Sequence, residues 1–333
     1  MHGAGMVQPG HVRQTDAPGT LEPPDVTVIV VNWNVRELLQ RCLESVKTHT
    51  RRYGHPRLHT IVIDNASSDG SAEMVRSRFP EATLVINLDN VGFGRAVNQA
   101  IAMATGRYCL LLNPDAEVLD SAIAAMTAYL DNHSEVGLVG PQLLNPDRTA
   151  QSSLRRFPTR RTAFVESTVL QRYLPRARVL QRYYCEDLAP NQVHEVDWLV
   201  GACLLVRRAT IQEVGGLDET FFMYSEEMEW CHRIKRAGWK VVYLPVPQVV
   251  HHHGQSSDQD VAARHIHFQD SKCKVIAMMY GRWMGALLRV FLLGTYVFQL
   301  IEECVKLALG HKRQMRRQRV GVLWQVLRSG LRG

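Results

Sequence analysis

The chain alternates short apolar runs with segments whose apolar residues recur three and four positions apart. The run VTVIVVNWN at 26–34 is β-branched and uninterrupted, which is typical of a strand buried on both faces. Helical spacing follows at 35–49. The alternation continues with strands predicted at 59–64, 82–90 and 108–118 and helices at 72–79 and 94–106. Successive strand–helix units predict an α/β fold with a mostly parallel central sheet flanked by helices.

Each of these predicted strands ends in polar residues. The residues are Asn32 and Asn34, Asp64 and Asn65, the segment 87–90, and Asn113 with Asp115. Ligands of open parallel sheets bind at the carboxyl ends of the strands. We therefore expect these side chains to meet in one crevice.

The second half of the chain predicts further elements of the same sheet. The pattern indicates a helix at 121–133, strands at 136–144, 196–208 and 240–257, and a short helix at 209–216. Residues 145–195 are irregular and rich in Arg and Tyr. These elements should form the second wall of the crevice.

The segment FFMYSEEMEWCHR at 221–233 places Glu226, Glu227 and Glu229 directly behind an apolar strip. Ser225 fits an N-cap, and acids in a first turn interact favourably with the helix dipole. This structural interpretation needs no chemistry. A carboxylate held at a helix N-terminus beside aromatic walls would also suit a general base.

The C-terminal region from 258 to 333 is predicted to be helical, basic and amphipathic. In the apolar segment 286–309, Val290, Val297 and Ile301 share one face and Glu302, Glu303 and Lys306 the opposite one. The uninterrupted apolar run is shorter than the about 20 residues of a spanning helix. With HKRQMRRQR at 311–319, the pattern favours a helix lying in the membrane interface. The alternative is a helix packed on the catalytic domain or in a homodimer interface.

Composition narrows the class of protein. The 333 residues are 46% hydrophobic and 21% charged, which indicates a globular chain, and residues 1–24 read as a disordered arm. The net charge of +7 comes with no nucleic-acid-binding module, so lipid or phosphate is favoured over nucleic acid as partner. Seven scattered cysteines without a C-x-x-C pair indicate reduced thiols in the cytoplasm and argue against zinc.

Three motifs indicate metal and phosphate chemistry. Asn113 and Asp115 are two residues apart, and a carboxylate beside an amide oxygen suits Mg²⁺ or Mn²⁺, although N-P-D is also a common turn. Histidines 251–253 could complete a manganese shell or simply be exposed. In DNVGFGRAVNQA at 89–100, Val97 stands where a dinucleotide fingerprint has its third glycine. The glycines there would instead let the backbone approach a ligand, with Arg95 meeting phosphate.

Seven ordered motifs together resemble the family-2 glycosyltransferases of the GT-A fold, closest to their bacterial rhamnosyltransferase-like branch. They are VTVIVVNWN, IVIDNASSDGS, NVGFGRAVNQA, LLLNPDAEV, WLVGACLLVRR, VGGLDETFFMYSEEMEWCHRIKRAGWKVVYLP and VVHHHGQSS. The likeness covers about residues 26–257. It implies a catalytic domain at 25–257, with a nucleotide-sugar-binding half at 25–120 and an acceptor-binding half at 121–257.

The resemblance also implies roles for single residues. Glu227 matches the catalytic base, and Asp115 and His251 match the groups that hold a divalent cation. The other implied contacts are Asn32, Asn34, Asp64, Asn65, Arg95 and Asn113 for the nucleotide sugar, and Trp198, Gly201, Glu226 and Glu229 for the acceptor. The expected reaction is an inverting transfer from a nucleotide-diphosphate sugar, with dTDP-rhamnose as the suggested donor. The expected acceptor is lipid-linked or a polysaccharide at the inner face of the cell membrane.

Two departures from the family pattern support a different reading. Asn113 replaces the first acid of the metal motif, and Glu227 stands where the family has Asp. A catalytically inactive protein that binds nucleotide or partners is therefore the alternative to an enzyme.

Overall fold

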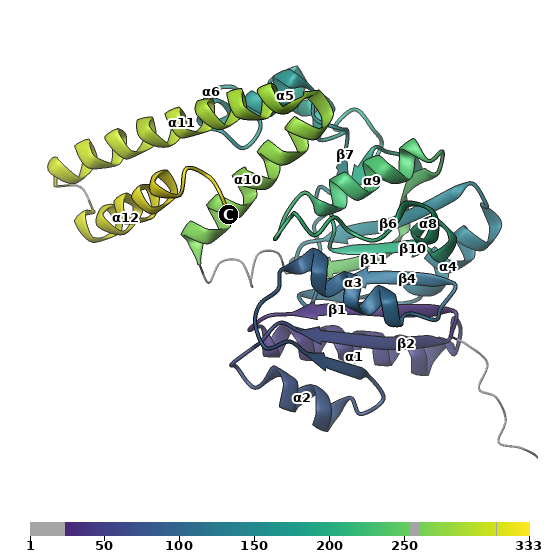
Figure 1. Ribbon diagram of the computed structural model, residues 1–333. Helices are drawn as coiled ribbons and strands as arrows, with labels where there is room; N and C mark the ends of the chain where they lie inside the picture. Colours follow the sequence, from purple (N-terminus) through teal and green to yellow (C-terminus); the bar gives the residue numbers. More distant parts are fainter. Residues whose placement is uncertain (1–23, 253–259, 311) are drawn as a thin grey trace, which may run out of the picture.

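The computed structural model describes residues 24–252, 260–310 and 312–333. The predicted arm thus lies outside the described residues apart from Pro24, and so does His253. A nine-stranded sheet has the order β3-β2-β1-β4-β10-β6-β11-β5, with β8 pairing to β11 (Figure 1). Its strands are β1 (Val26–Asn32), β2 (Leu58–Asp64), β3 (Thr83–Ile86), β4 (Tyr108–Leu112), β5 (Ala116–Val118), β6 (Val136–Leu144), β8 (His194–Glu195), β10 (Cys203–Arg207) and β11 (Lys240–His251).

Strands β1 to β4 are parallel to one another, and β10 runs antiparallel between β4 and β6. Alternate residues of β1 enter two different cores, with Val28 and Val30 on one face and Ile29 and Val31 on the other. The middle of the strand is apolar because both of its faces are covered. Helices α1 (Arg36–Tyr53), α2 (Ser71–Arg78) and α4 (Ala122–Asn132) contribute to the first core. Helices α3 (Phe93–Met103), α8 (Arg208–Val214) and α9 (Glu226–Arg236) contribute to the second.

Two predicted strands are broken by turns, and both breaks matter for the site. The strand expected at 108–118 ends at Leu112, and Asn113–Asp115 form a turn before β5, which pairs with β11. The strand expected at 196–208 divides into β9 (Trp198–Leu199) and β10. Strand β9 pairs instead with β7 (Leu154–Arg155) in a separate two-stranded sheet. The turns place residues 113–115 directly after β4 and residues 200–202 directly before β10, so both lie at the same end of these two paired strands.

The irregular stretch at 145–195 contains the two-residue strands β7 and β8 and three short helices, α5 (Arg160–Val165), α6 (Val169–Tyr173) and α7 (Arg178–Tyr183). Residues from 261 onward form α10 (Val261–Tyr280), α11 (Arg282–Ala308) and α12 (Arg313–Ser329). These three helices lie together beside the sheet (Figure 1) and share a third core with α5, in which Cys273, Leu288 and Val326 are buried.

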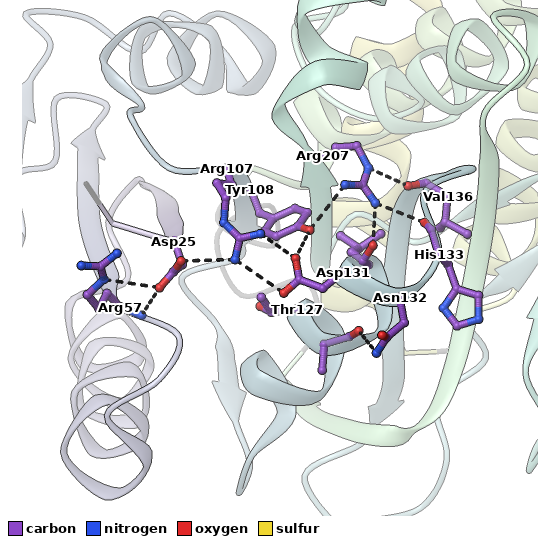
Figure 2. A network of polar contacts seen from close by, with 12 residues as sticks. Asp25, Arg57, Arg107, Tyr108, Thr127, Asp131, Asn132, His133, Val136 and Arg207 are labelled. Carbon is purple, nitrogen blue, oxygen red and sulfur yellow. Dashed lines mark hydrogen bonds and ion pairs between the residues drawn. The ribbon is translucent and has the colours of Figure 1, made fainter. Parts of the chain in front are cut away.

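A polar network closes the other edge of the sheet, where β1 and β4 begin (Figure 2). Arg107 pairs with Asp25 at 3.2 Å and with Asp131 at 2.6 Å. Arg207, at the end of the antiparallel β10, donates to the backbone oxygens of Leu130, His133 and Val136. The ends of β1, β4, β10 and α4 are thereby tied together.

Candidate active site

A cavity of about 590 Å³ lies at the carboxyl ends of β1 and β4. Its walls include the strand ends at Val31, Trp33 and Asn65, the turn 113–115, the segment 200–202, residues 223, 224, 226 and 227, and helix α10. His251 at the end of β11 also lines it. Of the predicted site residues, Asn65, Asn113, Asp115, Gly201, Glu226, Glu227 and His251 therefore share one cavity.

Asn65 lies at the centre of an amide cluster on the nucleotide-sugar side. Its Oδ1 accepts from Asn87 at 2.7 Å, and its Nδ2 donates to Asn90 Oδ1 and to the oxygen of Gly92, both at 3.3 Å. Because these bonds fix the Asn65 amide, the wall formed by Asn65 and Asn90 is pre-organised.

Asn32 and Asp64 support this wall but do not line the cavity. The register of β1 and β2 sets them side by side, and Asn32 Nδ2 donates to Asp64 Oδ2 at 2.9 Å. Asp64 Oδ1 accepts from the backbone N–H of Ser67 at 2.8 Å. Both side chains are buried, so the pair shapes the loop that follows β2.

Two residues predicted to contact the nucleotide sugar do not line this cavity. Asn34 turns to the neighbouring loop, where its Oδ1 accepts from the backbone N–H of Ser68 at 2.8 Å. Arg95 is exposed on α3, outside the cavity lining. The glycine at 92 also meets protein rather than ligand, because a Cβ there would lie 2.8 Å from the oxygen of Phe222.

Asp115 and His251 face each other as a candidate cation site. Both are buried, and His251 Nε2 lies 3.4 Å from Asp115 Oδ1 and 3.5 Å from Asn113 Nδ2. Gln151 Oε1 lies 2.8 Å from His251 Nδ1. An amide oxygen only accepts, so Nδ1 carries the hydrogen and the Nε2 lone pair points to the carboxylate side.

This donor set fits a hard divalent cation. A lone pair and a carboxylate oxygen repel each other unless a proton or a cation lies between them. In the described part of the chain no three His, Cys, Asp or Glu side chains gather to hold an ion alone. Mg²⁺ and Mn²⁺ sites commonly keep water and take substrate phosphates as further ligands, so Asp115 and His251 suffice as the protein's share.

The turn before α9 aims the glutamates into the cavity. Tyr224 and Ser225 both have positive φ, 70° and 63°, which non-glycine residues rarely adopt. Ser225 is the N-cap residue, as predicted, but its side chain makes no cap hydrogen bond. The turn instead leaves Glu226 and Glu227 together in the cavity wall.

Burial affects the two carboxyl groups unequally. Burial raises the pKa of Glu226 well above its ordinary value, and the charge of Glu227 adds to the rise. Burial raises the pKa of Glu227 as well, but backbone N–H groups of Gly201, Met228 and Glu227 itself donate to it and oppose the rise. Because Glu227 receives three donors and Glu226 one, burial raises the pKa of Glu226 further than the pKa of Glu227.

Two predicted acceptor contacts lie outside the cavity. Glu229 is buried and paired with Arg233, which also donates to the backbone of Val214 and Gly216. Its carboxylate therefore holds the loop before α9. Trp198 is buried, and its Nε1 donates to the oxygen of Arg156 at 3.1 Å.

Helix α10 supplies a wall that the sequence patterns did not indicate. Arg264, His265, Phe268 and Gln269 line the cavity at helical spacing. The helical spacing of these four residues is a pattern that could have indicated one face of a helix. The basic character of the region favoured a surface position instead.

Comparisons with known proteins agree with this geometry. Residues 23–267 match the family described as glycosyltransferase like family 2. An N-acetylglucosaminyl-diphospho-decaprenol L-rhamnosyltransferase of Mycobacterium tuberculosis (strain ATCC 25618 / H37Rv) is 30% identical over 279 residues, which span 80% of this chain and 89% of that protein. The rhamnosyltransferase WbbL of Escherichia coli (strain K12) is 24% identical, with coverages of 70% and 86%.

Solved structures give the fold. A mannosyltransferase from Pyrobaculum calidifontis in complex with GDP-Man and Mn²⁺ matches with a TM-score of 0.53 and 17% identity, over 95% of this chain and 89% of that one. GalNAc-T7 with UDP, GalNAc and Mn²⁺ matches with a TM-score of 0.55 and 15% identity, over 77% and 48%. Both have the GT-A fold, which confirms the predicted fold class. The chain therefore belongs to glycosyltransferase-like family 2 and resembles the rhamnosyltransferases of that family.

Proposed function

We propose that this protein transfers a sugar from a nucleoside-diphosphate donor to a hydroxyl group of a lipid-linked or polysaccharide acceptor, with inversion at the anomeric carbon. One observation carries the proposal: Asp115 and Glu227, from opposite halves of the domain, line the same cavity. The relatives named for rhamnosyl transfer favour rhamnose as the sugar and a polyprenyl-diphosphate-linked sugar as the acceptor. The reaction would then belong to the synthesis of cell-envelope glycan on the cytoplasmic side of the membrane.

Glu227 acts as the general base in this mechanism. Its Oε2 is buried and has no hydrogen-bond partner among the described residues, so it can accept the proton of an acceptor hydroxyl. The three backbone donors on the carboxylate hold it in position and oppose the rise of its pKa on burial. Deprotonation of the hydroxyl lets its oxygen attack the anomeric carbon from the side opposite the departing diphosphate, which inverts the configuration.

Asp115 and His251 would hold the divalent cation, Mg²⁺ or Mn²⁺. When bound, such an ion supplies positive charge that stabilises the diphosphate leaving group. Gln151 keeps His251 in the tautomer that can ligate, through the bond at Nδ1. The half-buried Asn113 places its amide beside the same imidazole.

The C-terminal helices would bind the membrane surface that carries the acceptor. Helix α11 is the one described helix long and apolar enough to cross a membrane, and a third of its most apolar stretch is buried. Two of its charged residues pair with neighbouring helices: Glu303 with Arg316 of α12, and Arg289 with Asp270 of α10. These pairs point inward, whereas Val290, Val297 and Ile301 are 69%, 45% and 59% exposed.

A surface helix of a soluble protein normally exposes its charged residues and buries its apolar face, and α11 does the reverse with these residues. Basic residues of the adjoining α12, including Arg313 and Arg317, are exposed and complement anionic headgroups. Because α11 is bound to α10 and α12 along one side, we propose that it lies in the interface rather than spanning the bilayer (Figure 1).

The decisive experiment measures nucleoside-diphosphate release by the purified protein with a panel of nucleotide sugars and a polyprenyl-diphosphate N-acetylglucosamine acceptor. Release should require the acceptor and a divalent cation and should collapse in Glu227→Gln, while donor binding measured by calorimetry persists. Donor binding without turnover in the wild type, across the whole panel, would instead support the inactive binding protein.

A further inference from the structure

We infer that helix α10 forms the binding site for the acceptor sugar, and that Gln269 determines acceptor recognition by accepting a hydrogen bond from it. The inference rests on the proposed function, because it assigns one wall of the same cavity. Gln269 lines the cavity and is only 4% exposed.

The side-chain amide of Gln269 uses its nitrogen, but not its oxygen, for hydrogen bonds among the described residues. Its Nε2 donates to the backbone oxygen of Ser167 at 3.3 Å, and the side chain also hydrogen-bonds Tyr296 of α11. Its Oε1 is buried and has no hydrogen-bond partner in the part of the chain that the structure describes. If the Gln269 amide were flipped, its Oε1 would face the backbone oxygen of Ser167, and two acceptors cannot form a hydrogen bond. The orientation of the amide is therefore determined.

Buried polar atoms without partners are rare because each costs about 1–3 kcal/mol. In a cavity wall, such an atom indicates the position of a ligand donor. Gln269 Oε1 can only accept, so the ligand must present a hydroxyl or an amide N–H at this point. Phosphate oxygens, which accept, do not fit there.

Contacts of α10 place this wall beside the catalytic glutamates. Ser271 Oγ donates to the oxygen of Met223 at 2.8 Å, and the ring of Phe268 lies edge-on to Tyr224 at 5.7 Å. Residues 223 and 224 lead directly into Glu226 and Glu227. A sugar whose hydroxyl reaches Glu227 therefore lies within the space bounded by α10.

His265 and Phe268 complete a surface suited to a pyranose ring. Phe268 offers an apolar face for the sugar carbons, as aromatic side chains do in sugar sites. His265 Nδ1 is 2.9 Å from the hydroxyl of Tyr296, which fixes the imidazole. Burial lowers the pKa of His265, and Arg264 adds to that effect, so the ring is neutral and can exchange hydrogen bonds with hydroxyls.

The test replaces Gln269 by Met, which keeps the length of the side chain and removes the accepting oxygen. The matched control is Gln171→Met, because Gln171 Oε1 accepts from the backbone N–H of the same Ser167 at 2.7 Å but does not line the cavity. Full-length protein is titrated calorimetrically with N-acetylglucosaminyl and with glucosyl diphospho-lipid of short chain length. Acceptor KM, donor KM and acceptor-independent donor hydrolysis are measured in parallel.

We expect Q269M to weaken acceptor binding and raise acceptor KM by roughly tenfold or more, the loss of one net hydrogen bond to a ligand. Donor KM and donor hydrolysis should stay within about twofold of the wild type, since only the acceptor contact is lost. If the oxygen accepts from an acetamido N–H, the loss is confined to the N-acetylglucosaminyl compound. If it accepts from a hydroxyl, both compounds lose affinity.

Unchanged acceptor affinity in Q269M, or equal losses in Q269M and Q171M, would overturn the inference. The binding measurement separates it from the proposed function. A wild type that binds acceptor without turnover would refute the transferase while leaving the role of Gln269 open to the same comparison of affinities.

Discussion

Gly201 and Glu227 are joined across the cavity wall: the backbone N–H of Gly201 donates to the Glu227 carboxylate. A Cβ at Gly201 would lie 3.5 Å from Glu227 Cγ, which is an ordinary contact distance. The turn between β9 and β10 thus holds the carboxylate from one side while α9 carries it from the other.

This contact predicts that activity depends on the length of the side chain at position 227. Glu227→Asp shortens the arm by one methylene and withdraws the carboxylate from the Gly201 N–H. We expect kcat to fall on the order of 100-fold, because a shift of about 1 Å in a catalytic group has that effect. Initial rates with saturating donor and acceptor measure it. Full activity in E227D would mean that the group need not be held at this position.

Protonation of Glu226 gives a stability prediction with a definite sign. The folded pKa is raised above the ordinary value of 4.5, so the folded chain retains a proton that the unfolded chain releases as pH rises. Stability contributed by this group is therefore lost above pH 4.5. Glu226→Gln does not titrate, so the free energy of unfolding of E226Q relative to the wild type should be larger near pH 8 than near pH 4.

Urea unfolding at the two pH values measures the difference. Glu229→Gln on the same helix is the control, because it breaks the pair with Arg233 at 2.7 Å. It should destabilise the protein near pH 8, the opposite of the effect of E226Q. A pH-independent difference for E226Q would show that Glu226 is ionised like an exposed carboxyl.

Gln151 should control the affinity for the cation. Gln151→Met removes the acceptor at His251 Nδ1, so the ring is no longer held in the ligating tautomer. We expect the Mn²⁺ concentration for half-maximal nucleoside-diphosphate release to rise about 10-fold or more. EDTA should abolish release in both proteins. Gln142→Met is the control, since Gln142 pairs with Gln248 at 3.0 Å and does not line the cavity; an equal shift in Q142M would contradict the role of Gln151.

The sequence predicted the sheet better than it predicted individual side chains. Apolar runs such as the one within 26–32 indicate strands buried on both faces, as in a parallel sheet. In a parallel sheet the carboxyl ends of the strands lie on the same side, so the residues that follow them can be predicted to lie together. Polar residues at those ends are ambiguous, because the same Asn or Asp can line a cavity or hold a loop. Asn65 does the first and Asn34 the second.

Contacts that form only in the folded chain explain the remaining differences. The i,i+4 spacing of Glu229 and Arg233 allows an ion pair, but the bonds from Arg233 to the carbonyls of Val214 and Gly216, which tie Glu229 to the loop, have no local signature. Gln269 lies 42 positions after Glu227, and contacts such as Ser271 with Met223 and Phe268 with Tyr224 bring its helix to the cavity. These contacts have no local signature in the chain either.

The network at the start of the strands should contribute stability without contributing to activity. Arg207→Met removes the guanidinium that donates to the backbone oxygens of Leu130, His133 and Val136 (Figure 2). We expect a loss of about 1–3 kcal/mol in the free energy of unfolding. Transfer rates per folded molecule should be unchanged. Arg208→Met is the control, because the exposed Arg208 side chain makes one such bond, to the oxygen of Thr105.

The exposed apolar row of α11 should determine binding to membranes. Changing Val290, Val297 and Ile301 together to Ser removes side chains that would be buried among acyl chains, so cosedimentation with phosphatidylglycerol vesicles should fall roughly tenfold or more. Leu88 and Val246 are 96% and 83% exposed elsewhere, and their double change to Ser should have no effect.

Added salt should weaken wild-type binding to the vesicles through screening of the α12 arginines. Equal sedimentation of both variants would assign the row to another partner, and a row that closes a dimer would instead make the triple variant monomeric in sedimentation equilibrium.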